Sequence, residues 1–341
     1  REEYVVYKNV NNIVVMKRVL FIAPLFFGYW EKIKNVFESY DMEVYFINQS
    51  LSKVNIKYRI IDRLSSKRVR DRQNIRYYSL KIQDVPDDID YVVVIRGDSL
   101  NIEIMHLMHK RFKSAKFVMY QWDSIKMNPV GYEIKDSFDE IYTFDPIDAK
   151  EFNWKYRPLF FDEKDCNINV DKDIDIAYFC TLKFKRAQLY KELKLIANRK
   201  KLKMFSYLFV DKLTFLKRKY INHDPLYSAI SISEVNYKAM PLKETSKIYD
   251  RSRVIVDYTT PEQTGLSMRS IESIGHACKL VTNNVFVKEE PFYCKENVFI
   301  YDENNFELPD EFIAAPYKNL NTDLYNYYSL NGWIKTILGM E

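Results

Sequence analysis

The chain of 341 residues contains little glycine, cysteine or histidine, with 7 glycines, 4 cysteines and 4 histidines. The cysteines, Cys166, Cys180, Cys278 and Cys294, lie far apart in the sequence and form no C-x-x-C pair. This spacing argues against a zinc knuckle and a disulfide scaffold and is typical of a reducing compartment. The histidines form no recognisable metal-ligand set, so we expect no metal.

Long apolar runs are also missing. The longest, from Val19 to Trp30, contains Pro24 and Gly28 and is shorter than the roughly 18 residues that a membrane span requires. Residues 1–15 carry several charges and no small-residue cleavage site, so they do not read as a signal peptide. Met16 looks like a start, and we predict that residues 1–15 are an extension ahead of the fold of a cytoplasmic protein.

The composition is that of a folded protein large enough for two domains, with 47% hydrophobic and 29% charged residues and a net charge of +5. Lys17–Pro24 reads as a buried strand, Tyr29–Tyr40 as a helix and Glu43–Ile47 as a second strand. This β-α-β order predicts a parallel sheet. No G-x-G-x-x-G follows the first strand, so a nicotinamide-dependent oxidoreductase loses its main support.

A second β-α-β series begins later in the chain. Residues 156–173 are polar and read as a linker, and Asp175–Cys180 is the first strand after them. Asn321–Leu338 is predicted to be a closing helix rich in tyrosine and leucine. The sequence thus predicts an α/β protein with two parallel sheets.

Three successive predicted strands of the first series each end in an acidic loop. The four carboxylates in these loops are Asp98, Asp123, Asp145 and Asp148. Because the carboxyl ends of parallel strands line the ligand crevice, we expect all four on or near one rim. Asp145 and Asp148 suit the capping of the helix that follows. Asp123 adjoins Trp122, which could stack on a sugar ring, and partial burial would suit Asp123 to act as a base.

The segment from Val254 to Val281 reads as strand, loop, helix and strand. Ser267 is placed to cap the helix, whose free N–H groups and dipole favour an anion such as a diphosphate. Arg269 and Glu272 are three residues apart and share one face, so a cation beside phosphate would adjoin a carboxylate for ribose hydroxyls. The alternative is an ordinary α/β crossover carrying an i,i+3 ion pair.

This segment resembles the donor-binding region of glycosyltransferases with the GT-B architecture. The closer similarity is to bacterial capsule and lipopolysaccharide transferases and the CgeB-like group, in which a small or glycine loop precedes R-x-x-E, here Gly265, Arg269 and Glu272. Thr264 stands where the common pattern has a first Glu, and Glu262 or Gln263 could substitute. The strings YQWDS and FDPID also resemble those of the bacterial transferases.

The resemblance implies two Rossmann-like domains facing across a cleft. Residues 16–155 would bind the acceptor, residues 174–320 the nucleotide-sugar donor, and residues 321–341 would pack back toward the N-terminal domain. Asp123, or else Asp98, would be the catalytic base. The donor-binding candidates are Thr181, Lys183, Arg186, Tyr258, Gln263, Thr264, Gly265, Ser267, Arg269 and Glu272. No cofactor is implied, since the nucleotide sugar is a substrate.

The function implied is glycosyl transfer from a nucleotide sugar to a glycan or lipid-linked acceptor in bacterial surface polysaccharide synthesis. The alternatives are a non-catalytic nucleotide-sugar-binding or scaffold protein, a nucleotide-sugar epimerase, and a polyol-phosphate transferase. The basic stretches Lys53–Arg76 and Lys212–Tyr220 are either solvated surfaces or contacts with anionic membrane. No motif supports nucleic-acid binding. Peripheral contact would place the protein at the inner face of the cell membrane.

Overall fold

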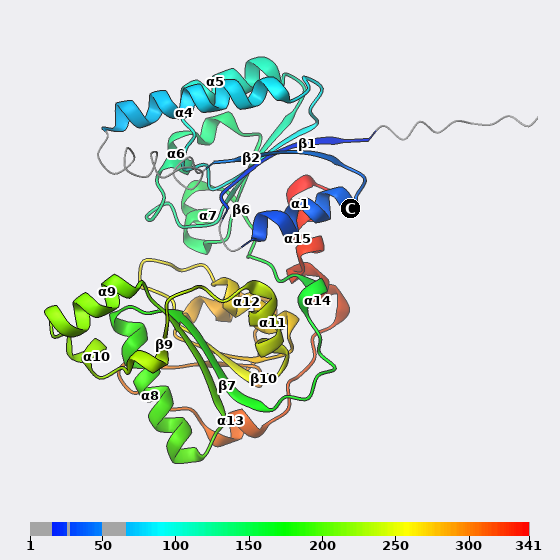
Figure 1. Cartoon of the computed structure of the whole chain (residues 1–341). Coiled ribbons are helices and arrows are strands. Elements are labelled where there is room, and N and C mark those ends of the chain that lie inside the picture. Colours follow the sequence, from blue (N-terminus) through cyan, green and yellow to red (C-terminus); the bar gives the residue numbers. More distant parts are fainter. Residues whose placement is uncertain (1–15, 26–27, 50–65, 341) are drawn as a thin grey trace, which may run out of the picture.

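The computed structural model describes residues 16–25, 28–49 and 66–340. The predicted extension at residues 1–15 and much of the basic stretch Lys53–Arg76 lie outside the described residues. The chain forms two α/β units, one above the other in Figure 1, each built on a six-stranded parallel sheet. These two sheets confirm the predicted fold class. None of the helices in the described ranges has the length and apolar character needed to span a bilayer.

The first sheet has the strand order β2-β1-β3-β4-β5-β6. Its strands read as near-continuous apolar runs because helices cover both faces. The strands are β1 Arg18–Ala23, β2 Glu43–Asn48, β3 Tyr91–Ile95, β4 Lys116–Gln121, β5 Glu140–Thr143 and β6 Lys155–Tyr156. The helices are α1 Tyr29–Ser39, α4 Lys67–Lys81, α5 Ile102–Arg111, α6 Val130–Glu133 and α7 Pro146–Phe152.

The second sheet has the order β12-β11-β10-β7-β8-β9. Its strands are β7 Ile174–Thr181, β8 Met204–Phe209, β9 Val235–Asn236, β10 Ser252–Asp257, β11 Lys279–Thr282 and β12 Val298–Ile300. The helices are α8 Phe184–Lys200, α9 Lys212–Leu216, α10 Pro225–Ser228, α11 Leu242–Asp250, α12 Met268–Gly275 and α13 Asp310–Ala314. The sequence did not predict β6 and β9, which are edge pairings of two residues each.

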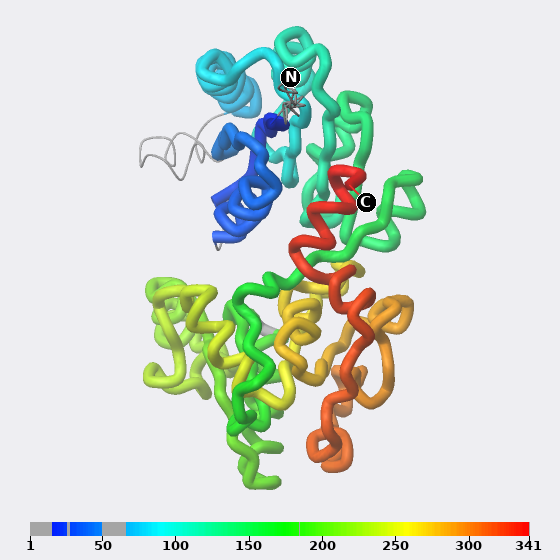
Figure 2. Tube along the Cα trace, turned by 90° about the vertical axis from the view of Figure 1, so that its right-hand side faces the viewer, coloured from blue at the N-terminus to red at the C-terminus, as the bar shows by residue number. Residues whose placement is uncertain are grey.

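The closing segment is two helices, α14 Thr322–Tyr328 and α15 Leu330–Leu338, instead of the single helix predicted. Ser329 breaks the helix because its backbone is extended and its hydroxyl accepts the N–H of Gly332 at 3.0 Å, capping α15. Helix α15 then lies against α1 and β4 of the first unit (Figure 2). Its fully buried Trp333 packs on Tyr120 and Phe160, with ring centroids 4.7 and 5.0 Å away.

Candidate functional site

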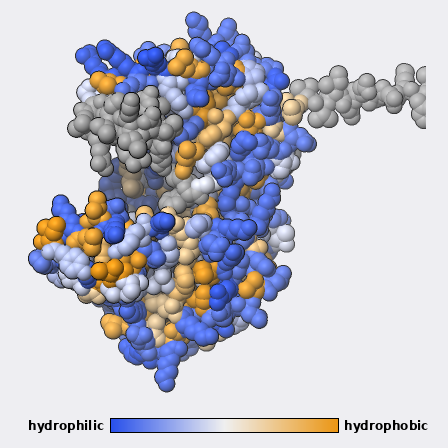
Figure 3. Space-filling view, viewed as in Figure 1, coloured by the Kyte–Doolittle hydropathy of each residue, from blue (hydrophilic) through white to orange (hydrophobic). Residues whose placement is uncertain are grey.

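A cavity of about 500 Å³ lies between the two units and is lined by residues of both. Figure 3 shows the surface hollowed at this level. Its volume is in the range of small-molecule sites in proteins. The walls contain polar groups of both units, from strand ends, from the loops after strands and from α12, namely Arg96, Asp123, Thr181, Gln263, Ser267, Arg269 and Glu272.

The N-terminus of α12 opens onto this cavity. The prediction that Ser267 caps the helix is confirmed, since its hydroxyl oxygen accepts the N–H of Ser270 at 3.3 Å. The same hydroxyl donates to Asp257 at 2.8 Å, and Asp257 also accepts from Ser270 Oγ at 3.2 Å. Asp257, the last residue of β10, therefore anchors the first turn of α12 through hydrogen bonds.

Arg269 is held by the same carboxylate. Its Nε lies 2.8 Å from Asp257 Oδ1, and Asp257 is fully buried whereas the Arg269 side chain remains 26% exposed at the cavity wall. Burial acts to raise the pKa of Asp257, but the charge of Arg269 and the hydrogen bonds of Ser267 and Arg269 hold it below its ordinary value. An ionised Asp257 thus orients a cation beside the N–H groups at the start of α12, an arrangement that favours an anion.

Glu272 connects the two units across the cavity. The hydroxyl of Tyr29, on α1, donates to Glu272 Oε1 at 2.8 Å. Burial and the neighbouring Glu272 carboxylate raise the pKa of Tyr29 well above its ordinary value, so the phenol stays protonated and remains a donor. Glu272 therefore has a hydrogen-bond partner in this structure that a ribose hydroxyl could replace.

The opposite wall carries Asp123, which pairs with Arg96 Nε at 3.1 Å. The same guanidinium pairs with Asp98 at 2.8 Å, so the two candidate bases share one arginine. Loss of hydration raises the pKa of Asp98, an effect that Arg96 opposes and Asp123 reinforces. Only Asp123 lines the cavity, and Arg96 adopts a left-handed φ of 69° there. Strained backbone of this kind is common at functional sites.

The loop before α12 is bound to the first unit through Asp145. Its buried carboxylate accepts the N–H groups of Thr264 and Gly265, each at 3.1 Å, as well as the hydroxyl of Thr264. It also caps α7, as predicted, by accepting the N–H of Ile147 at 3.0 Å. A Cβ on Gly265 would lie 2.5 Å from the ring of Phe144, so glycine permits this close approach. The predicted donor loop is therefore also a junction between the units.

Asp148, which the sequence predicted to cap the helix as Asp145 does, lies within α7 instead and accepts the N–H of Ile125 at 2.7 Å. Burial raises its pKa to about 6; the hydrogen bond from Ile125 opposes this and the charge of Asp145 adds to it. Since the unfolded carboxyl titrates near pH 4, its ionisation lowers folding stability as pH rises from about 4 to 6.

We therefore expect Asp148→Asn to increase the melting temperature at pH 7.5 relative to the wild type, and to leave it little changed at pH 4. Thermal unfolding across this pH range measures the effect. Asp136→Asn is the control, because the Asp136 side chain is 88% exposed. A wild-type advantage at pH 7.5 would contradict the prediction.

The structure brings together some of the predicted donor residues and not others. Thr181, Gln263, Ser267, Arg269 and Glu272 line the cavity. The other predicted donor residues do not line the cavity. Lys183 is exposed at the N-cap of α8, and Thr264 and Gly265 lie at the junction with Asp145. Arg186 Nη2 lies 3.5 Å from the carbonyl oxygen of Tyr258, and the Tyr258 hydroxyl lies 3.5 Å from Glu303.

One wall of the cavity was not predicted. It is apolar and aromatic, and its residues come from β7, β8, α11 and the loop before α11: Phe179, Tyr207, Phe209, Met240 and Tyr249. Alternate residues of a strand face the same side, so Tyr207 and Phe209 reach the cavity together. Aromatic faces of this kind suit a flat ring such as a nucleobase. Nothing local in the sequence distinguishes them from ordinary core residues.

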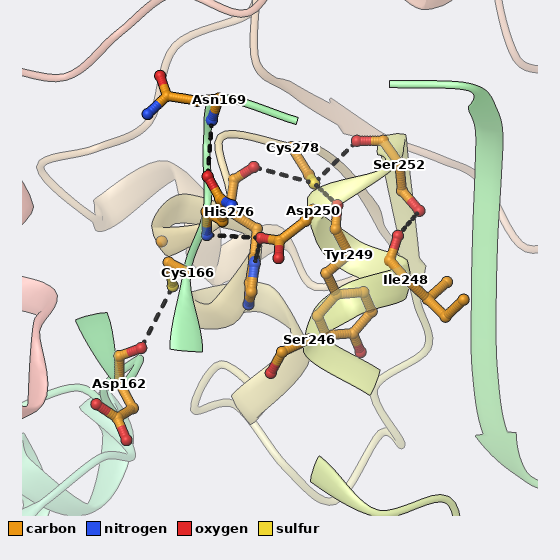
Figure 4. Close-up of polar contacts among 12 residues, drawn as sticks. Asp162, Cys166, Asn169, Ser246, Ile248, Tyr249, Asp250, Ser252, His276 and Cys278 are labelled. Carbon is orange, nitrogen blue, oxygen red and sulfur yellow. Dashed lines mark hydrogen bonds and ion pairs between the residues drawn. The ribbon is translucent and has the colours of Figure 1, made fainter. Parts of the chain in front are cut away.

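A polar cluster supports the far end of α12 (Figure 4). His276, which follows the helix, is paired through Nδ1 with Asp250 at 2.7 Å, and Asp250 also accepts the N–H of Asn167 at 2.8 Å. The thiol of Cys278 donates to the carbonyls of Tyr249 and Ser252, each at 3.1 Å. The cluster ties the predicted linker to α11 and α12. Within the described residues, no group of three or more His, Cys, Asp or Glu side chains could hold a metal ion.

Comparisons with known proteins identify the architecture. Neither a family model nor a curated protein matches the sequence. Solved structures match over nearly the whole chain. The match to the lipopolysaccharide outer core galactosyltransferase WaaB has 11% identity and a TM-score of 0.51, and it covers 94% of this chain and 99% of the WaaB chain. Anabaena HepE, solved with UDP and glucose, has 10% identity and a TM-score of 0.56, with 95% and 98% covered.

A protein from Listeria monocytogenes described as a putative UDP-N-acetylglucosamine 2-epimerase is similar to the same degree. Its identity is 9% and its TM-score 0.53, with 96% of this chain and 98% of the other covered. The protein thus has the GT-B fold of two facing Rossmann-like units. At these identities the comparisons define the fold and leave the reaction to the residues of the site.

Proposed function

We propose that the protein is a glycosyltransferase that moves a sugar from a nucleotide-sugar donor to a glycan or lipid-linked acceptor. The observation that carries the proposal is the arrangement at the start of α12. There a capped helix N-terminus, Arg269 and Glu272 face a cavity whose opposite wall presents Asp123. The helix N-terminus and Arg269 suit a diphosphate, Glu272 suits ribose hydroxyls, and Asp123 suits an attacking hydroxyl.

The donor diphosphate would lie at the N–H groups of α12, beside Arg269. As the bond between sugar and phosphate breaks, negative charge grows on the leaving diphosphate, and the oriented N–H groups and guanidinium stabilise it. Asp257 would keep Arg269 in this position. Glu272 would exchange the hydroxyl of Tyr29 for a sugar or ribose hydroxyl of the donor, and the aromatic wall would receive the base.

The acceptor would bind against the first unit. Asp123 would take the proton from the attacking hydroxyl if the reaction inverts configuration at the sugar. In a retaining reaction the donor phosphate itself could serve, and Asp123 would then bind the acceptor. Asp145, which joins the units beside the cavity, would limit hydrolysis of the donor by excluding water.

We place this reaction in bacterial surface polysaccharide synthesis, with the protein in the cytoplasm and in peripheral contact with anionic membrane at the inner face of the cell membrane. Support comes from the resemblance of Gly265, Arg269 and Glu272 to the R-x-x-E pattern of capsule and lipopolysaccharide transferases. The match in fold to an outer core galactosyltransferase is consistent with it.

Product analysis tests the proposal against the epimerase and scaffold alternatives. The protein is incubated with UDP-, GDP- and CMP-sugars, with and without a bacterial lipid-linked glycan extract, and products are identified by NMR and mass spectrometry. We expect release of the free nucleotide, faster with acceptor. If the reaction inverts configuration, Asp123→Asn should lose at least a hundredfold in transfer while nucleotide binding is retained. An epimerised nucleotide sugar without nucleotide release would contradict the proposal, as would no turnover of any donor.

A further inference from the structure

One end of the second unit presents apolar side chains to solvent. Helix α9 continues into a π-helical turn, Lys217–Ile221, and we call the segment Lys212–Ile221 the α9 tip. It lies at the left of the second unit in Figure 1, where Figure 3 shows hydrophobic and hydrophilic side chains side by side. Three of its large side chains are exposed: Leu213 to 77%, Tyr220 to 53% and Ile221 to 71%.

Packing of the core does not explain this exposure. The buried face of the α9 tip is supplied by Phe215, which is fully buried and packs on Tyr227 with ring centroids 6.0 Å apart. Leu213 and Ile221 are exposed instead. Single exposed aliphatic side chains are common on protein surfaces, and these differ in that they lie in one short segment beside several cations.

The charges of the α9 tip are all of one sign. It contains Lys212, Lys217, Arg218 and Lys219 and no acidic residue. Arg218 pairs with Asp224 at 3.3 Å, and Lys219 donates to the carbonyl of Ser228 at 2.8 Å. Lys212 and Lys217 form no salt bridge with any other residue that the structure describes. Both side chains are exposed, and Lys212 Nζ also lies 5.9 Å from the centre of the Tyr237 ring. Two cations without a carboxylate partner in the described part of the chain therefore adjoin the exposed apolar side chains.

We propose that the α9 tip is a docking surface for an anionic lipid bilayer. Lysines bind acidic headgroups electrostatically, with their apolar stems lying along the interface, while leucine and isoleucine insert below the headgroups. Tyrosine is enriched at this depth of membranes. Single apolar side chains beside cations suit insertion into a bilayer. A protein partner typically binds a continuous flat patch instead. The inference rests on the proposed function for the lipid-linked acceptor, and it adds the surface at which the protein would meet the membrane.

Vesicle sedimentation of the full chain without nucleotide tests the proposal. Phosphatidylcholine vesicles are compared with vesicles that contain phosphatidylglycerol. We expect binding to the anionic vesicles only, weakening as salt rises. Each lysine near the surface contributes about fivefold to affinity, so Lys212→Gln with Lys217→Gln should weaken binding about 25-fold.

A second variant separates insertion from charge. Leu213→Ser with Ile221→Ser keeps every charge and is expected to weaken binding at least tenfold. Leu195→Ser is the matched control, because Leu195 on α8 is 69% exposed but outside the α9 tip, and its binding should equal that of the wild type. Nucleotide-induced thermal shifts of all variants report whether the fold and the donor site are intact, so failure here is distinct from failure of the proposed function.

Three results would overturn the proposal: no binding of the wild type to anionic vesicles, equal binding of the wild type and both double variants, or a loss of binding in Leu195→Ser as large as theirs. Self-association in analytical ultracentrifugation that Leu213→Ser with Ile221→Ser abolishes, without vesicle binding, would assign the α9 tip to a protein interface instead.

Discussion

Asp145→Asn is expected to lower the free energy of unfolding by about 2–4 kcal/mol, because hydrogen bonds to a buried charged group are worth about 1.5–3 kcal/mol each. Both carboxylate oxygens of Asp145 accept N–H groups, so an asparagine must turn its own NH₂ toward a donor. The loop from Thr264 would then lose its contact with the first unit. We also expect about tenfold weaker nucleotide binding, since this loop leads directly into α12.

Denaturant unfolding and calorimetric titration with nucleotide measure the two effects. Thr264→Val removes one hydroxyl contact with Asp145 and should produce a smaller loss of the same kind. Asp136→Asn makes the same change of charge at an exposed position and should stay within about 0.5 kcal/mol of the wild type. If Asp145→Asn is no less stable than Asp136→Asn, the junction does not join the units.

Arg269→Met is expected to cost about 3–5 kcal/mol of folding stability at pH 7, because it removes the guanidinium that pairs with the fully buried Asp257. The folded pKa of Asp257 lies below its unfolded value near 4. The stability contributed by this pair is therefore present above pH 4 and lost as pH falls through the folded pKa, so the deficit of the variant should shrink below about pH 4.

A double-mutant cycle separates this structural role from ligand binding. Adding Asp257→Asn to Arg269→Met removes the unpaired charge and should recover much of the stability, whereas nucleotide affinity stays low because the cation is still missing. Arg269→Lys keeps the charge and should bind nucleotide better than Arg269→Met. Equal stability of Arg269→Met and the wild type would contradict the account of this pair.

Local patterns in the sequence predict the elements around the site well. The apolar spacing after Ser267 and its capping side chain predict α12, and Asp145 caps its helix as expected. The prediction of one closing helix was wrong, because the apolar spacing continues through Ser329 without a break. Serine is a capping residue, so Ser329 itself could have indicated that one helix ends there and another begins.

Contacts between distant residues could not be predicted in this way. Glu272 meets Tyr29 across 243 positions and Asp145 meets Thr264 across 119. No periodicity or short motif encodes such pairs, because they depend on how the two units face one another. Asp257 is different, since an aspartate at the end of a buried strand, before a capped helix, is a local signal that could have identified the partner of Arg269.

The central claim is that the cavity at the start of α12 binds a nucleotide sugar. Thermal unfolding in the presence of UDP, GDP, CMP and their sugar conjugates tests it most directly, with Glu272→Gln measured beside the wild type. A nucleotide at about a hundred times its dissociation constant stabilises the folded state by roughly 2.7 kcal/mol, so we expect one nucleotide class to raise the melting temperature, and less so in Glu272→Gln. No shift with any member of the panel, or an equal shift in both proteins, would contradict the assignment of this site.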